Sequence, residues 1–278
     1  MSDQRTAAAP GHPGPAARTP APASGPRPLR AYAATTGRIL RQLRNDRRTV
    51  AMILVVPAAL MTLLYFIYQN TPAGPQQTTS LFDRVGISML GILPFIVMFL
   101  ITAIAMQRER TSGTLERLLT TPLSKLDLLA GYGTAFSIAA AAQATVACLV
   151  SFGLLDLYSA GSPAWVVLIA MVDAMLGVAL GLLCSAFART EFQAVQFMPV
   201  VAAPQIFLCG LLVPREQLPD WLRVISDLLP LSYAVDALQE VSLHAEPGAA
   251  MWWDLAVVAA FAAVALALGA ATLRRRTV

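Results

Sequence analysis

Long apolar stretches with almost no charge alternate with short polar segments along the chain. Charged residues are missing from 49–82, 86–107, 192–214 and 255–273, and residues 128–188 contain only Asp156 and Asp173. A helix needs about 20 apolar residues to cross the hydrocarbon core of a bilayer. The pattern therefore predicts an all-α membrane protein with six transmembrane helices, at residues 50–69, 87–106, 128–152, 164–188, 193–213 and 253–273.

Composition agrees with this class. Of the 278 residues, 56% are hydrophobic and 13% are charged, whereas soluble domains carry about 25% charged residues. A water-soluble globular fold is therefore excluded.

The chain before the first span divides into two predicted parts. Residues 1–28 hold seven of the 19 prolines and many alanines, a composition typical of a disordered tail. Residues 29–49 predict an amphipathic helix, with arginines on one face and apolar residues on another. Such a helix suits the headgroup layer of a membrane, although a solvated basic helix is an open alternative. Residues 50–278 then form the six-span domain.

Basic residues are distributed unequally between the two sides of this layout. With the N-terminus inside, 17 of the 20 lie in inner segments, and only Arg84, Arg215 and Arg223 lie in outer segments. The positive-inside rule therefore predicts that both termini are cytoplasmic.

The sequence lacks the residue patterns that several kinds of catalytic site require. Lys125 is the only lysine, and it does not follow the glycines of a phosphate-binding loop, so this chain has no ATPase site of that type. His12 and His244 match no metal-ligand spacing, and the three cysteines lie in apolar windows, so neither a metal site nor a disulfide framework is expected. No pattern for an intramembrane protease is present.

The inner segment 107–127 has room for structure of its own. After a charged exit from the second span and a glycine break at Gly113, the spacing of leucines predicts a short amphipathic helix. This helix either docks on a partner or rests at the lipid surface. The segment from Glu109 to Ser124 resembles the hallmark segment of type-2 ABC transporter permeases, the family that includes the membrane subunits of daunorubicin-type drug exporters. The resemblance implies a cytoplasmic coupling helix that contacts the ATPase through Glu109, Arg110, Gly113, Thr114, Glu116, Arg117, Leu118, Thr121 and Pro122.

The outer segment 214–251 carries a second match to the same family. Its two pieces, 209–222 and 229–238, resemble the family signature G-x-x-x-P-x-x-x-L-P-x-W-L followed by P-L-x-Y-x-x-D-x-L, although Leu229 stands where the family usually has Asn. The resemblance implies a re-entrant element that closes the outer end of the pathway, and a simple connecting loop is the alternative. The residues expected at this gate are Pro214, Pro219, Trp221, Pro230 and Tyr233.

The resemblance also implies a function and partners. The chain would be the permease subunit of an ATP-driven exporter in the bacterial plasma membrane, moving amphipathic drugs or lipid-like molecules outward. It would bind no cofactor itself, because ATP and Mg would sit on a separate ATPase subunit. A second permease copy would complete the complex, and no nucleic acid would bind.

Three polar side chains are predicted within the spans, at comparable depth: Asp173, Gln143 and Gln205. An acidic group near the bilayer midplane is costly and has to face protein, water or a cation. The three residues either form a polar patch on the substrate path or clamp helices together through hydrogen bonds. A proton-coupled secondary transporter that uses Asp173 is the alternative function.

Overall fold

The computed structural model describes residues 28–70, 80–113 and 125–272, and within these ranges the chain is helical, with no strand. The predicted tail therefore lies almost wholly outside the described residues, as do Arg274, Arg275 and Arg276. The elements run in the order α1 (Pro28–Asn45), α2 (Arg47–Tyr68), α3 (Leu81–Thr111), α5 (Lys125–Gly153), α6 (Pro163–Ser185), α7 (Glu191–Leu208), η1 (Arg215–Gln217), α8 (Asp220–Asp227), α9 (Pro230–Leu243) and α10 (Ala249–Thr272).

Five of the described helices are long and apolar enough to cross a membrane: α2, α3, α5, α6 and α10. They match five of the six predicted spans. The sixth prediction, 193–213, falls on α7, which has 18 residues and ends at Leu208. Its 18 residues include Glu191, three glutamines and two prolines, and α7 is not among the described helices that reach the length and apolarity of a span.

Helices α3 and α6 form the centre of the bundle. In each, 61% of the most apolar window is buried, against 17% in α2 and 28% in α10. Two glycines explain the close packing, because a methyl group on Gly177 or Gly181 of α6 would lie 2.4 Å and 2.5 Å from the carbonyl oxygens of Phe95 and Phe99. Small residues spaced four apart allow such backbone contact between helices in membranes.

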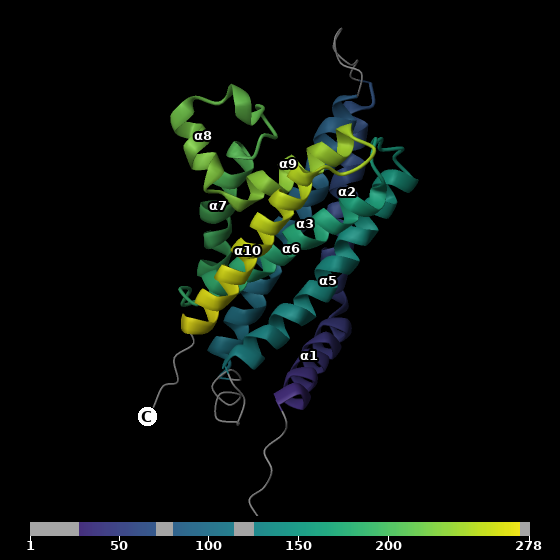
Figure 1. Cartoon of the computed structure of the whole chain (residues 1–278). Helices are drawn as coiled ribbons and strands as arrows, with labels where there is room; N and C mark the ends of the chain where they lie inside the picture. Colours follow the sequence, from purple (N-terminus) through teal and green to yellow (C-terminus); the bar gives the residue numbers. More distant parts are fainter. Residues whose placement is uncertain (1–27, 71–79, 114–124, 273–278) are drawn as a thin grey trace, which may run out of the picture.

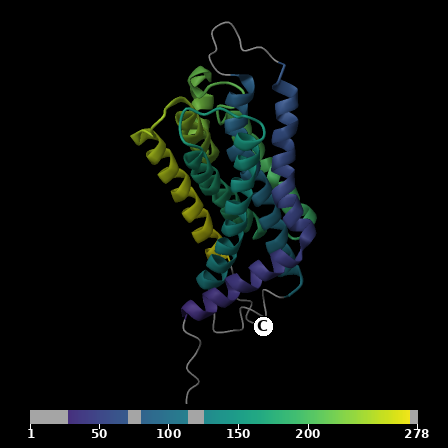
Figure 2. The same ribbon diagram turned by 90° about the vertical axis from the view of Figure 1, so that its right-hand side faces the viewer.

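Helix α1 runs across one end of the bundle, and α2 rises along its side (Figure 2). The end of α10 lies at the same end of the bundle as α1, and α8 lies at the other (Figure 1). The predicted interfacial helix, 29–49, is thus two elements, because the chain breaks between Asn45 and Arg47. Asp46 caps α2 by accepting hydrogen bonds from the amide and hydroxyl of Thr49, and these bonds lower the pKa of its carboxyl.

Candidate functional site

The cytoplasmic coupling site predicted from the sequence begins at the end of α3. The helix ends at Thr111, and Gly113 adopts a left-handed conformation with φ of 71°. Glycine favours this conformation just after a helix, so the expected glycine break is confirmed. The other predicted coupling residues, Thr114, Glu116, Arg117, Leu118, Thr121 and Pro122, lie outside the described residues.

Glu109 is held against two other helices. It is 7% exposed, and its Oε1 lies 3.7 Å from Nη1 of Arg38 on α1. Nη2 of Arg38 donates a 2.7 Å hydrogen bond to the hydroxyl of Tyr132 on α5. A second contact between α1 and α5 joins the hydroxyls of Tyr32 and Thr134 at 2.6 Å. The end of α3 is therefore connected to α1 and α5 through charged and polar side chains.

The neighbours of Glu109 differ in their partners. Arg108 is 64% exposed at its side chain and forms a two-pronged ion pair with Glu191, at 3.2 Å and 3.3 Å, which joins α3 to the start of α7. Arg110 has buried Nε and Nη2 atoms without a partner among the described residues. The two arginines thus separate into one that fixes α7 and one that has unused hydrogen-bonding capacity.

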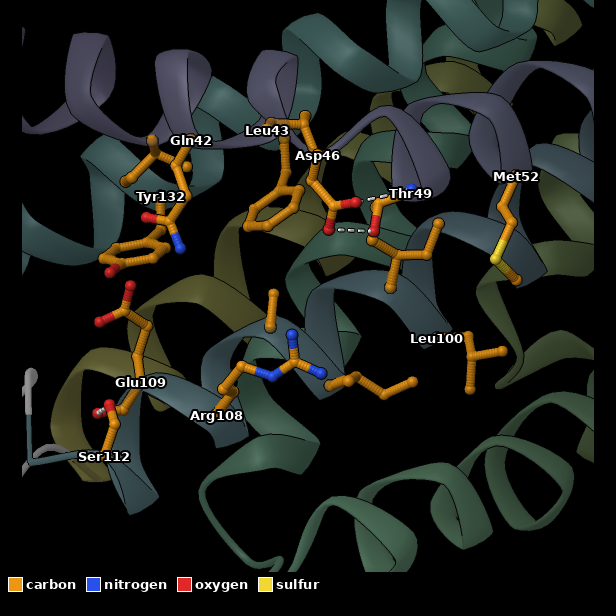
Figure 3. Close-up of a pocket in the computed structure, with 15 residues that line it drawn as sticks. Gln42, Leu43, Asp46, Thr49, Met52, Leu100, Arg108, Glu109, Ser112 and Tyr132 are labelled. Atoms are coloured by element: carbon orange, nitrogen blue, oxygen red, sulfur yellow. Dashed lines mark hydrogen bonds between the residues drawn. The ribbon is translucent and has the colours of Figure 1, made fainter.

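A cavity of about 370 Å³ lies beside this cluster, between the α1–α2 junction and helices α3 and α5. Asp46 and Thr49 face it from the junction, and Arg108 and Glu109 face it from α3 (Figure 3). Sequence patterns did not indicate this cavity, because it requires the break at Asp46.

The three polar residues predicted within the spans are all buried, but no hydrogen bond among the described residues joins any two of them. Asp173 on α6 packs beside Gly91 of α3, where a methyl group would lie 3.3 Å from its Oδ2. Neither its carboxylate nor the amide of Gln143 has a partner in the described part of the chain. Gln205, in contrast, accepts a 3.3 Å bond from the amide of Leu231 and donates a 3.0 Å bond to the carbonyl of Val201. Of these three side chains, Gln205 alone bonds to another helix within the described ranges.

At the opposite end, the predicted gate region consists of short helical pieces divided at prolines. Pro214 and Pro219 precede η1 and α8, and Pro230 is the first residue of α9. Trp221 is exposed, whereas the hydroxyl of Tyr233 donates a 2.7 Å bond to the carbonyl of Asp227. Prolines thus divide this segment into short pieces, and its role as a gate stays a prediction.

Arg215 connects these pieces, a role that sequence reasoning missed. Its guanidinium pairs with Asp227 of α8 and Asp236 of α9, and it lies 5.5 Å from the ring centre of Tyr233. Ser226 adds a 2.8 Å bond to the carbonyl of Leu208 at the end of α7. The sequence gave no local signal for these pairs, because the two aspartates are 12 and 21 residues away from Arg215 and lie in other helices.

The amino-acid sequence is similar to those of several known proteins. Residues 30–243 match the family described as ABC-2 type transporter. The chain is 28% identical over 176 residues to the probable multidrug ABC transporter permease YbhR of Escherichia coli strain K12, covering 62% of this chain and 48% of that protein. It is 26% identical over 165 residues to the linearmycin resistance permease protein LnrN of Bacillus subtilis strain 168, covering 59% and 43%.

A third relative, nodulation protein J of Rhizobium leguminosarum bv. viciae, is 28% identical over 181 residues, covering 62% of this chain and 66% of that protein. The chain spans about half the length of the first curated relatives it matches. The family match covers well over half of the chain and includes the end of α3 and the outer helical pieces. The chain belongs to the ABC-2 type transporter family, as a type-2 ABC permease.

Proposed function

We propose that this chain is the permease subunit of an ATP-driven exporter, that it moves amphipathic drugs or lipid-like molecules outward, and that a separate ATPase subunit binds the ATP and Mg. The observation that carries the proposal is the family match over residues 30–243. Two relatives named as a multidrug permease and a linearmycin resistance permease support a drug-like substrate. The sequence has no phosphate-binding loop, which is consistent with an ATPase on another chain.

A cytoplasmic N-terminus, with α2 and α3 as the first two spans, would place the segment after α3 on the cytoplasmic side of the bacterial plasma membrane. The excess of basic residues in inner segments supports this orientation. Six spans, including α7, would return the chain to the same side, which agrees with the position of α1 and the end of α10 at one end of the bundle (Figure 1). The segment from Gly113 to Pro122 would then dock on the ATPase, and Glu109 and Arg110 would connect it to the bundle. A second permease copy, most simply an identical one, would complete the pathway.

Motion would pass from the ATPase to the bundle through the end of α3. Glu109 is buried and lies beside Arg38 of α1, so a displacement of this end has to move α1 or break the contact. The ion pair of Arg108 with Glu191 connects the same end to α7. At the far end of α7, the pieces around Pro214, Pro219, Trp221, Pro230 and Tyr233 would act as the outer gate.

The test compares charge reversals at the two ends of the molecule. The chain is reconstituted with its cognate ATPase, and ATP hydrolysis and ATP-dependent ethidium export are measured in inverted vesicles. Glu116→Arg should lower export at least tenfold, because a reversed charge in the docking segment weakens contact with the ATPase. Glu246→Arg is the matched control at an exposed position after α9, outside the pieces proposed as the gate, and it should retain export. Equal export by the two variants would contradict the docking role.

Asp173→Asn addresses the alternative function and the substrate path. Loss of export in a folded, ATPase-bound variant supports a path role for Asp173, whereas loss of folded protein supports a packing role. Export that needs no ATPase and follows an imposed proton gradient would replace the proposal by a proton-coupled transporter.

A further inference from the structure

The cavity at the α1–α2 junction changes from polar to apolar along its length. Asp46, Arg108 and Glu109 line its polar end. Met52, Leu100 and Ile104 line the rest, one turn or more further into α2 and α3. Helix α2 leaves this end of the bundle and α3 returns to it (Figure 2), and the charged residues at the start of α2 and the end of α3 line one cavity. A molecule that fits the cavity therefore has a polar head and an apolar chain.

The apolar part of the cavity is accessible from the side of the bundle. Met52 is 57% exposed, and the neighbouring residues of α2 that face outward, such as Val55, are equally exposed and apolar. In a membrane this face contacts lipid, because it lies on a helix long enough to span the bilayer. A ligand can therefore enter from the surrounding leaflet without crossing the bundle.

The polar end of the cavity offers a carboxylate oxygen and a guanidinium group to a ligand. Oε2 of Glu109 is buried and has no partner at normal hydrogen-bond geometry among the described residues, although the hydroxyl of Tyr132 lies beside this carboxylate. Arg108 gives Nε and Nη2 to Glu191, and its Nη1 lies outside that pair on a side chain that is 64% exposed. Figure 3 shows the carboxylate of Glu109 beside the hydroxyl of Tyr132, and the guanidinium of Arg108 extending towards the side of the cavity on which Asp46 lies. Buried polar groups are normally satisfied, so an unpaired carboxylate oxygen at a cavity indicates a missing donor.

We infer that this cavity binds one zwitterionic aminophospholipid, a phosphatidylethanolamine, from the adjoining leaflet. The phosphate lies at Arg108, the ammonium donates to Glu109, and one acyl chain packs along Met52, Leu100 and Ile104. Cavities of a few hundred Å³ with an apolar wall and a few polar groups are typical binding sites. The site depends on the membrane location of the chain and not on transport.

The charges favour this headgroup over its common alternatives. The charges around the polar end are already balanced, because Asp46 and Glu109 face Arg108 in the lining and Arg38 beside Glu109. An anionic phospholipid without an ammonium would add an uncompensated negative charge there, whereas a zwitterionic headgroup adds none. A choline headgroup carries its positive charge on a quaternary nitrogen, which has no N–H to donate to Oε2 of Glu109. A primary ammonium is a charge-assisted donor and meets both requirements.

The experiment measures lipid retention by the purified full-length chain. After removal of bound lipid, equal amounts of phosphatidylethanolamine, phosphatidylcholine and phosphatidylglycerol are added, and retained lipid is counted by native mass spectrometry. The native chain should retain phosphatidylethanolamine preferentially. Ile104→Trp fills the apolar part of the cavity and should lower this retention at least tenfold. Ile138→Trp, on the exposed face of α5 outside the cavity, should retain as much as the native chain.

Glu109→Gln tests the headgroup contact. A neutral amide removes the ionic partner of the ammonium, so phosphatidylethanolamine and phosphatidylcholine should be retained equally. If Ile104→Trp does not purify, Leu100→Trp fills the same part of the cavity. Equal retention of all three lipids by the native chain, a preference for phosphatidylglycerol, or undiminished retention in the filled variant would each overturn the inference. None of these results depends on ethidium export, so they leave the proposed function unaffected.

Discussion

The side chain of Gln205 on α7 accepts a hydrogen bond from the first turn of α9. In most helices a residue at the start of the same helix accepts this bond. Helix α9 begins after Leu229, whose apolar side chain accepts no capping bond. The amide of Leu231, at the second helical position, instead donates to Oε1 of Gln205 on α7 at 3.3 Å. The side chain of an N-cap residue normally accepts a bond from the second or third amide. Gln205 therefore replaces the cap and at the same time fixes α9 to α7.

This arrangement predicts a compensating pair of substitutions. Gln205→Leu leaves the buried amide of Leu231 without an acceptor, which costs about 1–3 kcal/mol of folding free energy. Leu229→Asn introduces a good cap at an extended backbone position, worth about 0.5–2 kcal/mol. The melting temperature of the purified chain should fall in Gln205→Leu and recover in the double variant. If the double variant melts at the same temperature as Gln205→Leu alone, the lost hydrogen bond of the Leu231 amide does not account for the loss of stability.

The role of a single residue could be predicted from the sequence where that residue restricts the backbone conformation at its own position. The break at Gly113 and the breaks at Pro214, Pro219 and Pro230 are of this kind, because backbone conformation limits these residues locally. Arg38 is the opposite case. The helical pattern grouped it with the exposed arginines of α1, yet it is half-buried against Tyr132. That contact depends on where α5 lies, which periodicity does not encode.

At the scale of elements, the contact between α3 and α6 is set by glycines. Gly177 and Gly181 face the carbonyl oxygens of Phe95 and Phe99 so closely that no side chain fits between the helices. Without a hydrophobic driving force between helices in lipid, this close packing is a main source of association. It also places Asp173, one turn before Gly177, beside Gly91 of α3.

Adding one carbon at this contact should therefore be costly. Gly181→Ala would put a methyl group 2.5 Å from a carbonyl oxygen and force α3 and α6 apart, at a cost of about 1–3 kcal/mol. The control is Gly133→Ala on α5, where the nearest atom is 3.7 Å away. Thermal stability in detergent should drop in the first variant and stay level in the second. Equal stability of the two would mean that the helices readjust freely.

The elements themselves were largely predictable from the sequence, because long apolar windows have few alternatives to a spanning helix. Five predicted spans correspond to helices long and apolar enough to cross a membrane. Helix α7 departs from its prediction because the apolar window 193–213 continues beyond the helix, which ends at Leu208. The sequence pattern could not separate the last residues of α7 from the turn at Gly210, where φ is 91°.

At the scale of the whole molecule, the two ends of the bundle differ in chemistry. One end carries α1 with its arginines and the charged end of α3, and the other carries η1, α8 and the start of α9 (Figure 1). At the latter end, Arg215 is neutralised by two aspartates. An unequal distribution of basic residues fixes orientation through the positive-inside rule. The end with α1 should therefore face the cytoplasm.

Labelling of single cysteines in cells tests this orientation directly. In a background where Cys148, Cys184 and Cys209 are replaced by alanine, Arg44→Cys and Arg223→Cys place a thiol at an exposed position at each end of the bundle. A membrane-impermeant maleimide should label Arg223→Cys in intact cells and Arg44→Cys only after permeabilisation. Each variant removes one of many basic residues, so neither should invert the chain. The reverse labelling pattern would mean that the bundle has the opposite orientation. The segment after α3 would then lie outside the cell and could not contact a cytoplasmic ATPase.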